Sequence, residues 1–99
     1  MSPRRFAARR GPADANQPEI VRALKACGAS VVDLHAMGGG CPDLLVGYRG
    51  KDYKMEVKTA KGELRDSQED FARDWKGSPV IVVRSTVEAL TAIGVRIDA

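Results

Sequence analysis

The sequence predicts an α/β fold, in which a mixed central sheet is flanked by helices in the order helix, three strands, helix, strand, helix. Apolar residues recur at helical spacing in two segments, and runs of strand length lie between and after them. Three strands joined by short turns, followed by a crossover through a helix, favour a mixed sheet. The 99 residues, of which 43% are hydrophobic and 29% charged, suffice for one modest core.

Asn16 or Gln17 is expected to cap the first helix, with Pro18 in its first position and Gly28 at its end. Its inward stripe consists of residues about one turn apart: Ile20, Leu24 and Cys27. Glu19 falls in the first turn, where a carboxylate is favoured by the helix dipole alone.

Two strands are expected to follow this helix. Residues 30–35 are strand-like, and three glycines at 38–40 connect them to the next strand. The apolar run 44–46 predicts a strand that is buried on both faces and is therefore central. His35 is expected near the substrate groove, or merely exposed, rather than acting as a catalytic base.

The third strand carries the charged residues of greatest interest. Over residues 53–59 charged and apolar side chains alternate, so Glu56 and Lys58 share one half-buried face. A hairpin that turns through residues 48–52 would pair this strand with the preceding one, in a register that could bring Asp43 beside Glu56.

The second long helix is expected to begin near Ser67. Phe71 and Trp75 lie four residues apart, which favours a place in the core over a role in stacking on bases. The same stripe extended backward reaches Gln68, which should face the sheet and find a hydrogen-bonding partner. The alternative is that Gln68 only closes the helix terminus.

The last third of the chain predicts a strand and a helix. The apolar run 80–83 indicates another central strand. Ser85 and Glu88 form a capping box that opens a helix, and Gly94 ends it. Residues 95–97 could add a short edge strand.

The acidic and basic residues of the two central strands have the order and spacing of a metal-dependent nuclease centre. Asp43 follows Pro42, and Glu56 and Lys58 come thirteen and fifteen residues later. Cα atoms two apart in a strand are roughly 6.6 Å apart, so both side chains could address one phosphate. Mg²⁺ prefers one or two carboxylates with retained waters and phosphate oxygens. Alone, the Glu56–Lys58 motif would favour a surface ion pair and Asp43 could be a turn residue; only their combination, in this order and spacing, favours the metal site.

These motifs together resemble a known family. Gly40-Cys41-Pro42-Asp43, Glu56-Val57-Lys58-Thr59 and the segment 62–68 are similar to the restriction-endonuclease-like PD-(D/E)XK superfamily, most closely its VRR-NUC branch, over about residues 16–90. The resemblance implies a restriction-endonuclease-like αβββαβ core. The glycine-rich segment before Gly40 departs from the family pattern.

The resemblance also implies roles for individual residues. Asp43 and Glu56 would hold the metal, and Val57 would lend a backbone carbonyl. Lys58 would orient the attacking water or stabilise charge, and Gln68 would support the site. Glu19 matches a glutamate that family members use on the first helix. The alternative is that Glu19 only interacts with the helix dipole.

Charge adds an expectation about nucleic acid. Residues 1–15 contain four arginines and one aspartate, which accounts for the whole formal charge of +3, so residues 16–99, expected to form one domain, sum to zero. The Arg-rich segment is expected to be a flexible arm that engages phosphates, or simply a solvated terminus. Basic residues near the site are candidates for binding nucleic acid: Lys54, Lys61 and Arg65.

Composition bounds the location of the protein. No apolar run has the length of a membrane span, and the Arg-rich start lacks the apolar core of a secretory signal. Cys27 and Cys41 give no disulfide framework and no zinc pattern with His35. A cytoplasmic protein with reduced cysteines and no membrane partner is expected.

The expected function is that of a metal-dependent DNA endonuclease using one or two Mg²⁺ ions, for which Mn²⁺ could substitute. The related family acts on branched or flap DNA, and its small members resemble four-way-junction resolvases, which implies structure-selective cleavage. A chain this small favours a homodimer. Two alternatives stay open: a non-catalytic nucleic-acid-binding module with a structural acidic pair, and an interaction domain whose charged residues are surface ion pairs.

Overall fold

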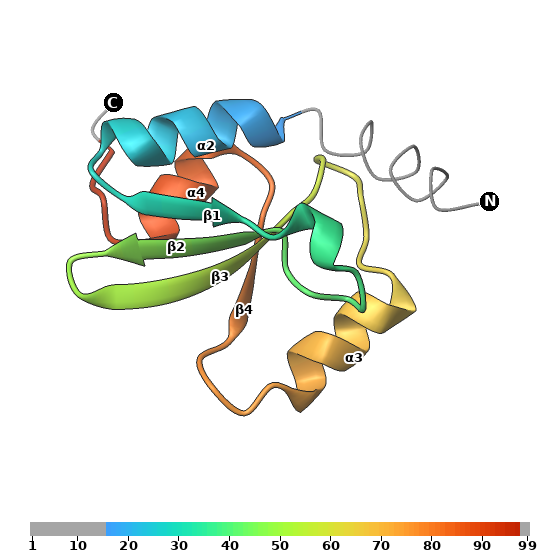
Figure 1. Cartoon of the computed structure of the whole chain (residues 1–99). Coiled ribbons are helices and arrows are strands. Elements are labelled where there is room, and N and C mark those ends of the chain that lie inside the picture. The colour runs from blue at the N-terminus through green and yellow to red at the C-terminus, as the bar shows by residue number, and fades with distance from the viewer. Residues whose placement is uncertain (1–15, 98–99) are drawn as a thin grey trace.

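Helices α2 and α4 pack on one face of a four-stranded sheet, and α3 stands apart from them at one end (Figure 1). The structure is a computed structural model that describes residues 16–97. Its elements, in chain order, are α2 (Gln17–Ala26), β1 (Ser30–Asp33), the short 3-10 helix η2 (His35–Met37), β2 (Leu44–Tyr48), β3 (Lys51–Val57), α3 (Asp66–Asp74), β4 (Val80–Val83) and α4 (Thr86–Ala92). This order confirms the predicted α/β arrangement with a mixed sheet.

The strands lie in the order β1-β2-β3-β4. β1 pairs with β2 and β2 with β3 in antiparallel fashion, whereas β3 and β4 are parallel. The parallel pair follows from the crossover through α3, because a parallel neighbour cannot be reached by a tight turn. The order places β2 and β3 at the centre and β4 at an edge, so the prediction that β4 is central is wrong.

The β2–β3 hairpin fixes the relation between the two acidic positions. Its turn consists of two residues, Arg49 and Gly50, with φ of +51° and +82°, which matches the right-handed twist of the flanking strands. The turn is therefore shorter than the predicted 48–52. Leu44 pairs with Met55, and one further step in this register brings Asp43 opposite Glu56.

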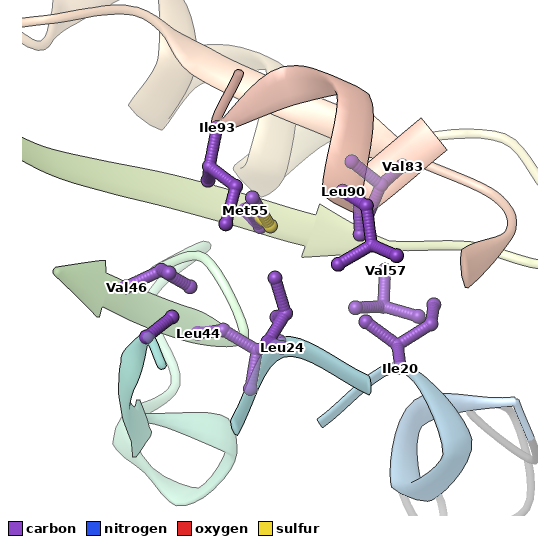
Figure 2. Packing of buried hydrophobic residues seen from close by; sticks show 11 residues of the cluster. Ile20, Leu24, Leu44, Val46, Met55, Val57, Val83, Leu90 and Ile93 are labelled. Atoms are coloured by element: carbon purple, nitrogen blue, oxygen red, sulfur yellow. The ribbon is translucent and has the colours of Figure 1, made fainter. Parts of the chain in front are cut away.

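The core lies between the sheet and the layer of α2 and α4 (Figure 2). Its largest side chains come from both helices and from the inward positions of the strands: Ile20, Leu24, Leu44, Val46, Met55, Val57, Val83, Leu90 and Ile93. Leu45 points to the other face and is 37% exposed, so the prediction that this strand is buried on both faces is wrong. The reason is that α2 and α4 cover only one side of the sheet.

The ends of several elements can be compared with the sequence-based expectations, and two of them differ. His35 lies in η2 rather than in a strand, because β1 ends at Asp33. Among the described residues, 95–97 contain no strand. The predicted capping box of α4 is half present: Ser85 Oγ accepts a hydrogen bond from the Glu88 N–H at 3.1 Å, but the Glu88 carboxylate accepts from the Arg84 N–H at 2.7 Å instead of from Ser85.

Helix α3 contributes no buried residue to the core. Phe71 and Trp75 stack on each other, with ring centroids 5.1 Å apart and an interplanar angle of 12°, and Trp75 is 47% exposed. The prediction that these two rings belong to the core is therefore wrong. The helical spacing is real, but α3 packs at the end of the sheet instead of in the layer of α2 and α4.

Within residues 16–97, no helix is both long enough and apolar enough to cross a membrane.

Candidate functional site

Two buried carboxylates lie at the end of the sheet where β2 begins and β3 ends. Asp43 is 5% exposed and Glu56 is 2% exposed, and they occupy facing positions on the two central strands. The carboxylate of Asp43 accepts a hydrogen bond from the backbone N–H of Val57 at 2.8 Å. This bond holds the Asp43 side chain against β3 and explains why the acid at the mouth of β2 does not turn toward solvent.

Glu56 is held from two sides. Its Oε2 accepts a hydrogen bond from Gln68 Nε2 at 2.9 Å and lies 3.7 Å from Lys58 Nζ. The side chain of Lys58 is itself only 12% exposed. A lysine ammonium thus lies beside the buried carboxylate of Glu56, and a buried anion is costly unless cations or donors compensate it.

Gln68 performs both of the roles that the sequence left as alternatives. Its Oε1 accepts the backbone N–H of Arg65 at 2.8 Å, which closes the first turn of α3. Its amide nitrogen reaches Glu56 across the gap between helix and sheet. The start of α3 is therefore fixed to the acidic pair by one side chain.

The glycine-rich loop explains how α3 can approach the site so closely. Gly40 has φ of +80°, and a Cβ placed there would collide with the backbone carbonyl of Ser67. Only glycine can adopt this positive φ and also leave room for the Ser67 carbonyl without strain. The adjacent Cys41 lies within the influence of the acids: burial, then the charges of Glu56 and Asp43, raise the pKa of its thiol above the ordinary value.

His35, which was expected near the substrate groove or merely exposed, lies beside the acidic pair. His35 Nδ1 lies 3.7 Å from Asp43 Oδ1, and its backbone N–H donates to Asp33 Oδ1 at 2.8 Å. Asp33 also accepts from the amide of Gln17 at 3.5 Å. A chain of polar contacts therefore runs from α2 through Asp33 and His35 to Asp43. Sequence periodicity could not predict it, because His35 lies in the short helix η2 and not in a regular strand.

Two residues that the sequence did not single out for the site support its backbone. The amide of Asn16 donates to the carbonyl oxygens of Lys58 at 3.2 Å and Arg84 at 3.3 Å, and so joins the ends of β3 and β4. The guanidinium of Arg84 donates to the carbonyls of Thr59 and Gly62. Asn16 was expected as a helix cap, but its side chain makes no capping bond.

The remaining predicted residues lie farther out. The side chain of Glu19 is exposed in the first turn of α2 and forms no hydrogen bond or ion pair with another described residue, whereas Gln17 and Ile20 of that turn are buried. Lys61 and Arg65 are exposed on the segment between β3 and α3. Lys54 donates to Ser78 Oγ at 2.6 Å and lies on the same side of β3 as Glu56.

The acidic pair is the part of this site that could bind a divalent cation. In the part of the chain that the structure describes, no group of three or more His, Cys, Asp or Glu side chains is arranged to hold a metal ion. Asp43 and Glu56 supply two carboxylates, which is the number that Mg²⁺ commonly takes from a protein when waters and phosphate oxygens complete its octahedron. The pair therefore supplies the number of carboxylates that a Mg²⁺ ion shared with a substrate would need, and does not by itself form a closed metal cage.

Comparison with models of known protein families, with curated proteins and with solved structures finds no match for this chain.

Proposed function

We propose that the chain is a metal-dependent DNA endonuclease of the VRR-NUC type, with a restriction-endonuclease-like core, that hydrolyses phosphodiester bonds in branched or four-way-junction DNA. The observation that carries the proposal is the buried pair of Asp43 and Glu56 beside Lys58. The predicted register is observed, and the motif residues it brings together are those that the resemblance named.

Asp43 and Glu56 are the residues that would hold Mg²⁺ or Mn²⁺, with the Val57 carbonyl as a further ligand. Such an ion supplies Lewis acidity and lowers the pKa of a water that attacks the phosphate. Glu19 is retained as a candidate ligand; because it is exposed on α2, it would have to reach the site when DNA and metal are bound.

The side chains around the acids have separate tasks in this proposal. Lys58, near Glu56, provides fixed positive charge where the scissile phosphate gains negative charge. Gln68 and the Val57 N–H hold the two carboxylates in place before the substrate arrives. Lys54, Lys61 and Arg65 would contact phosphates along the strand.

We further propose that the protein acts as a homodimer in the cytoplasm. A single chain of 99 residues offers little surface to a duplex, and two copies would present two sites to two strands of a junction. The Arg-rich segment 1–15, which lies outside the described residues, would add sequence-independent affinity for phosphates.

A second candidate function is a nucleic-acid-binding module in which the acids are structural. Within residues 16–97 no three His, Cys, Asp or Glu side chains are arranged to hold a metal ion together, which favours this alternative. The near burial of Lys58 beside Glu56 favours the enzyme, since a largely desolvated ammonium at this place supplies fixed positive charge for a bound phosphate.

A cleavage assay tests the proposal. Single-stranded, duplex, flap and four-way-junction DNA are incubated with Mg²⁺ or Mn²⁺ and with the wild type, Glu56→Gln or Lys58→Ala. Cleavage of branched DNA is expected from the wild type, with a loss of roughly 100-fold or more in each variant. Glu63→Gln and Lys51→Ala alter exposed residues of the same kinds and should cut normally. Undiminished cleavage by both site variants would remove the assignment, and binding without any cleavage would favour the module.

A further inference from the structure

The aromatic pair Phe71 and Trp75 lies outside the core and beside the candidate site. The two rings are nearly parallel, and Trp75 is 47% exposed. A groove runs along this side of α3 and is lined by Gly39, Ser67, Asp70, Phe71, Asp74 and Trp75. A contiguous apolar surface that is rimmed by polar residues is typical of a binding site.

The aromatic pair lies on the same helix as Gln68, which contacts Glu56. Gln68, which bonds Glu56, is three residues before Phe71 and seven before Trp75. At 1.5 Å per helical residue, the groove extends roughly 10 Å from the first turn of α3, which corresponds to about three nucleotides of a stacked strand. A strand cut at Glu56 could therefore reach the indole.

The charges in the groove are compensated. Arg73 forms an ion pair with Asp70 at 3.0 Å and a two-pronged pair with Asp74 at 3.0 and 3.2 Å. Lys54 adds an ammonium 5.3 Å from the centroid of the Trp75 ring. Two acids are thus matched by two cations, so the groove does not repel a nucleic-acid strand as its acidic residues alone would.

We propose that the aromatic pair stacks an unpaired nucleobase of the DNA substrate about three nucleotides from the bond that is cut. The base takes the place of the Lys54 ammonium on the indole, and Lys54 turns to a phosphate of the same strand. A base can stack only where it is not held in a duplex, so this contact selects DNA with unpaired nucleotides at a branch. The inference rests on the proposed function, because it assigns the substrate class of that site.

Trp75 is the only tryptophan in the chain, so its fluorescence reports directly on this contact. The full chain is titrated, without divalent metal, with a ten-nucleotide oligothymidine and with an abasic strand of the same length and charge, and binding is followed in parallel by anisotropy. Quenching by the base-containing strand is expected, with about tenfold weaker binding of the abasic strand. Equal affinity for both strands, no quenching at saturation, or no binding of either strand would overturn the inference.

Substitutions at the ring give a second test. Trp75→Phe keeps an aromatic face and should retain the preference for the base-containing strand, whereas Trp75→Ala should lose it. Val87→Ala, at an exposed apolar residue of α4, is the control and should bind as the wild type does. If Trp75→Ala does not fold, the comparison of the two strands on the wild type still decides. A dimer in sedimentation that is lost only in Trp75→Ala would show that a second copy covers the pair, and would contradict the inference.

The two proposals fail separately. Base-dependent quenching without cleavage would remove the nuclease and leave a module that stacks unpaired bases. Cleavage of junctions without base-dependent quenching would leave the nuclease and remove the stacking site.

Discussion

Gln68 of α3 donates a hydrogen bond to Glu56 of β3 at 2.9 Å while its carbonyl oxygen accepts the N–H of Arg65 at the start of the same helix. One side chain therefore sets both where α3 begins and how Glu56 is oriented. Because α3 contributes no buried residue, its position at the site depends on such specific contacts more than on the core.

Gln68→Ala should lower cleavage by roughly 10- to 100-fold, because the carboxylate of Glu56 loses the donor that orients it. Stability should fall by only about 1 kcal/mol, since the bond is partly exposed. Cleavage rates and urea unfolding measure the two effects. Glu69→Ala, at the exposed neighbouring position, is the control. Unchanged cleavage in Gln68→Ala would mean that Glu56 needs no such support.

Gly40→Ala and Gly38→Ala form a matched pair. Both positions have positive φ, +80° and +75°, so both substitutions carry backbone strain, of about 1–3 kcal/mol. Only at Gly40 does the new methyl group meet the backbone of Ser67; at Gly38 nothing lies within 4 Å. We expect Gly40→Ala to lose more stability and to lose cleavage as α3 moves away from Glu56. Equal urea midpoints for the two variants would contradict the close packing of loop and helix.

Asn16→Ala should destabilise the fold by about 1–3 kcal/mol, because the carbonyls of Lys58 and Arg84 lose a shared donor. The measurement is chemical denaturation at fixed pH. Glu19→Ala, in the exposed part of the same helical turn, should change stability by less than about 0.5 kcal/mol. An equal loss in both variants would indicate a general effect on α2 instead of the bridge between β3 and β4.

Leu24→Ala removes a fully buried side chain from the centre of the core and should cost about 2–5 kcal/mol. Leu45→Ala is the comparison, because Leu45 lies on the uncovered face and is 37% exposed. The free energy of unfolding lost in Leu45→Ala should be smaller than that lost in Leu24→Ala by at least about 1 kcal/mol. Similar losses at the two positions would show that the second face of the sheet is covered in solution.

Several parts of this fold could be predicted from periodicity. Strand alternation placed Glu56 and Lys58 on one face, and the hairpin register brought Asp43 opposite Glu56, as observed. The spacing of Ile20 and Leu24 identified the buried side of α2. These features depend on local repeats, which a sequence displays directly.

Other parts could not be predicted, because they depend on which faces are covered. Leu45 and residues 80–82 of β4 are apolar, but within residues 16–97 the helices α2 and α4 cover only the other face of the sheet, so these residues are partly exposed. Phe71 and Trp75 have the spacing of a core stripe on a helix that lies outside the core. The contact of His35 with Asp43 and the bridge made by Asn16 join residues far apart in the chain, through single side chains without periodicity.

The central claim is that Asp43 and Glu56 bind one divalent cation together, and direct titration with Mn²⁺, followed by the paramagnetic resonance of the free ion, tests it most closely. Asp43→Asn has nearly the same shape and keeps an oxygen acceptor for the Val57 N–H, so the fold should persist while one charge is removed. The account predicts that the wild type removes Mn²⁺ from solution and that Asp43→Asn and Glu56→Gln each bind it at least about tenfold more weakly. Equal Mn²⁺ binding by the wild type and both folded variants, or none by any of them even with DNA present, would contradict it.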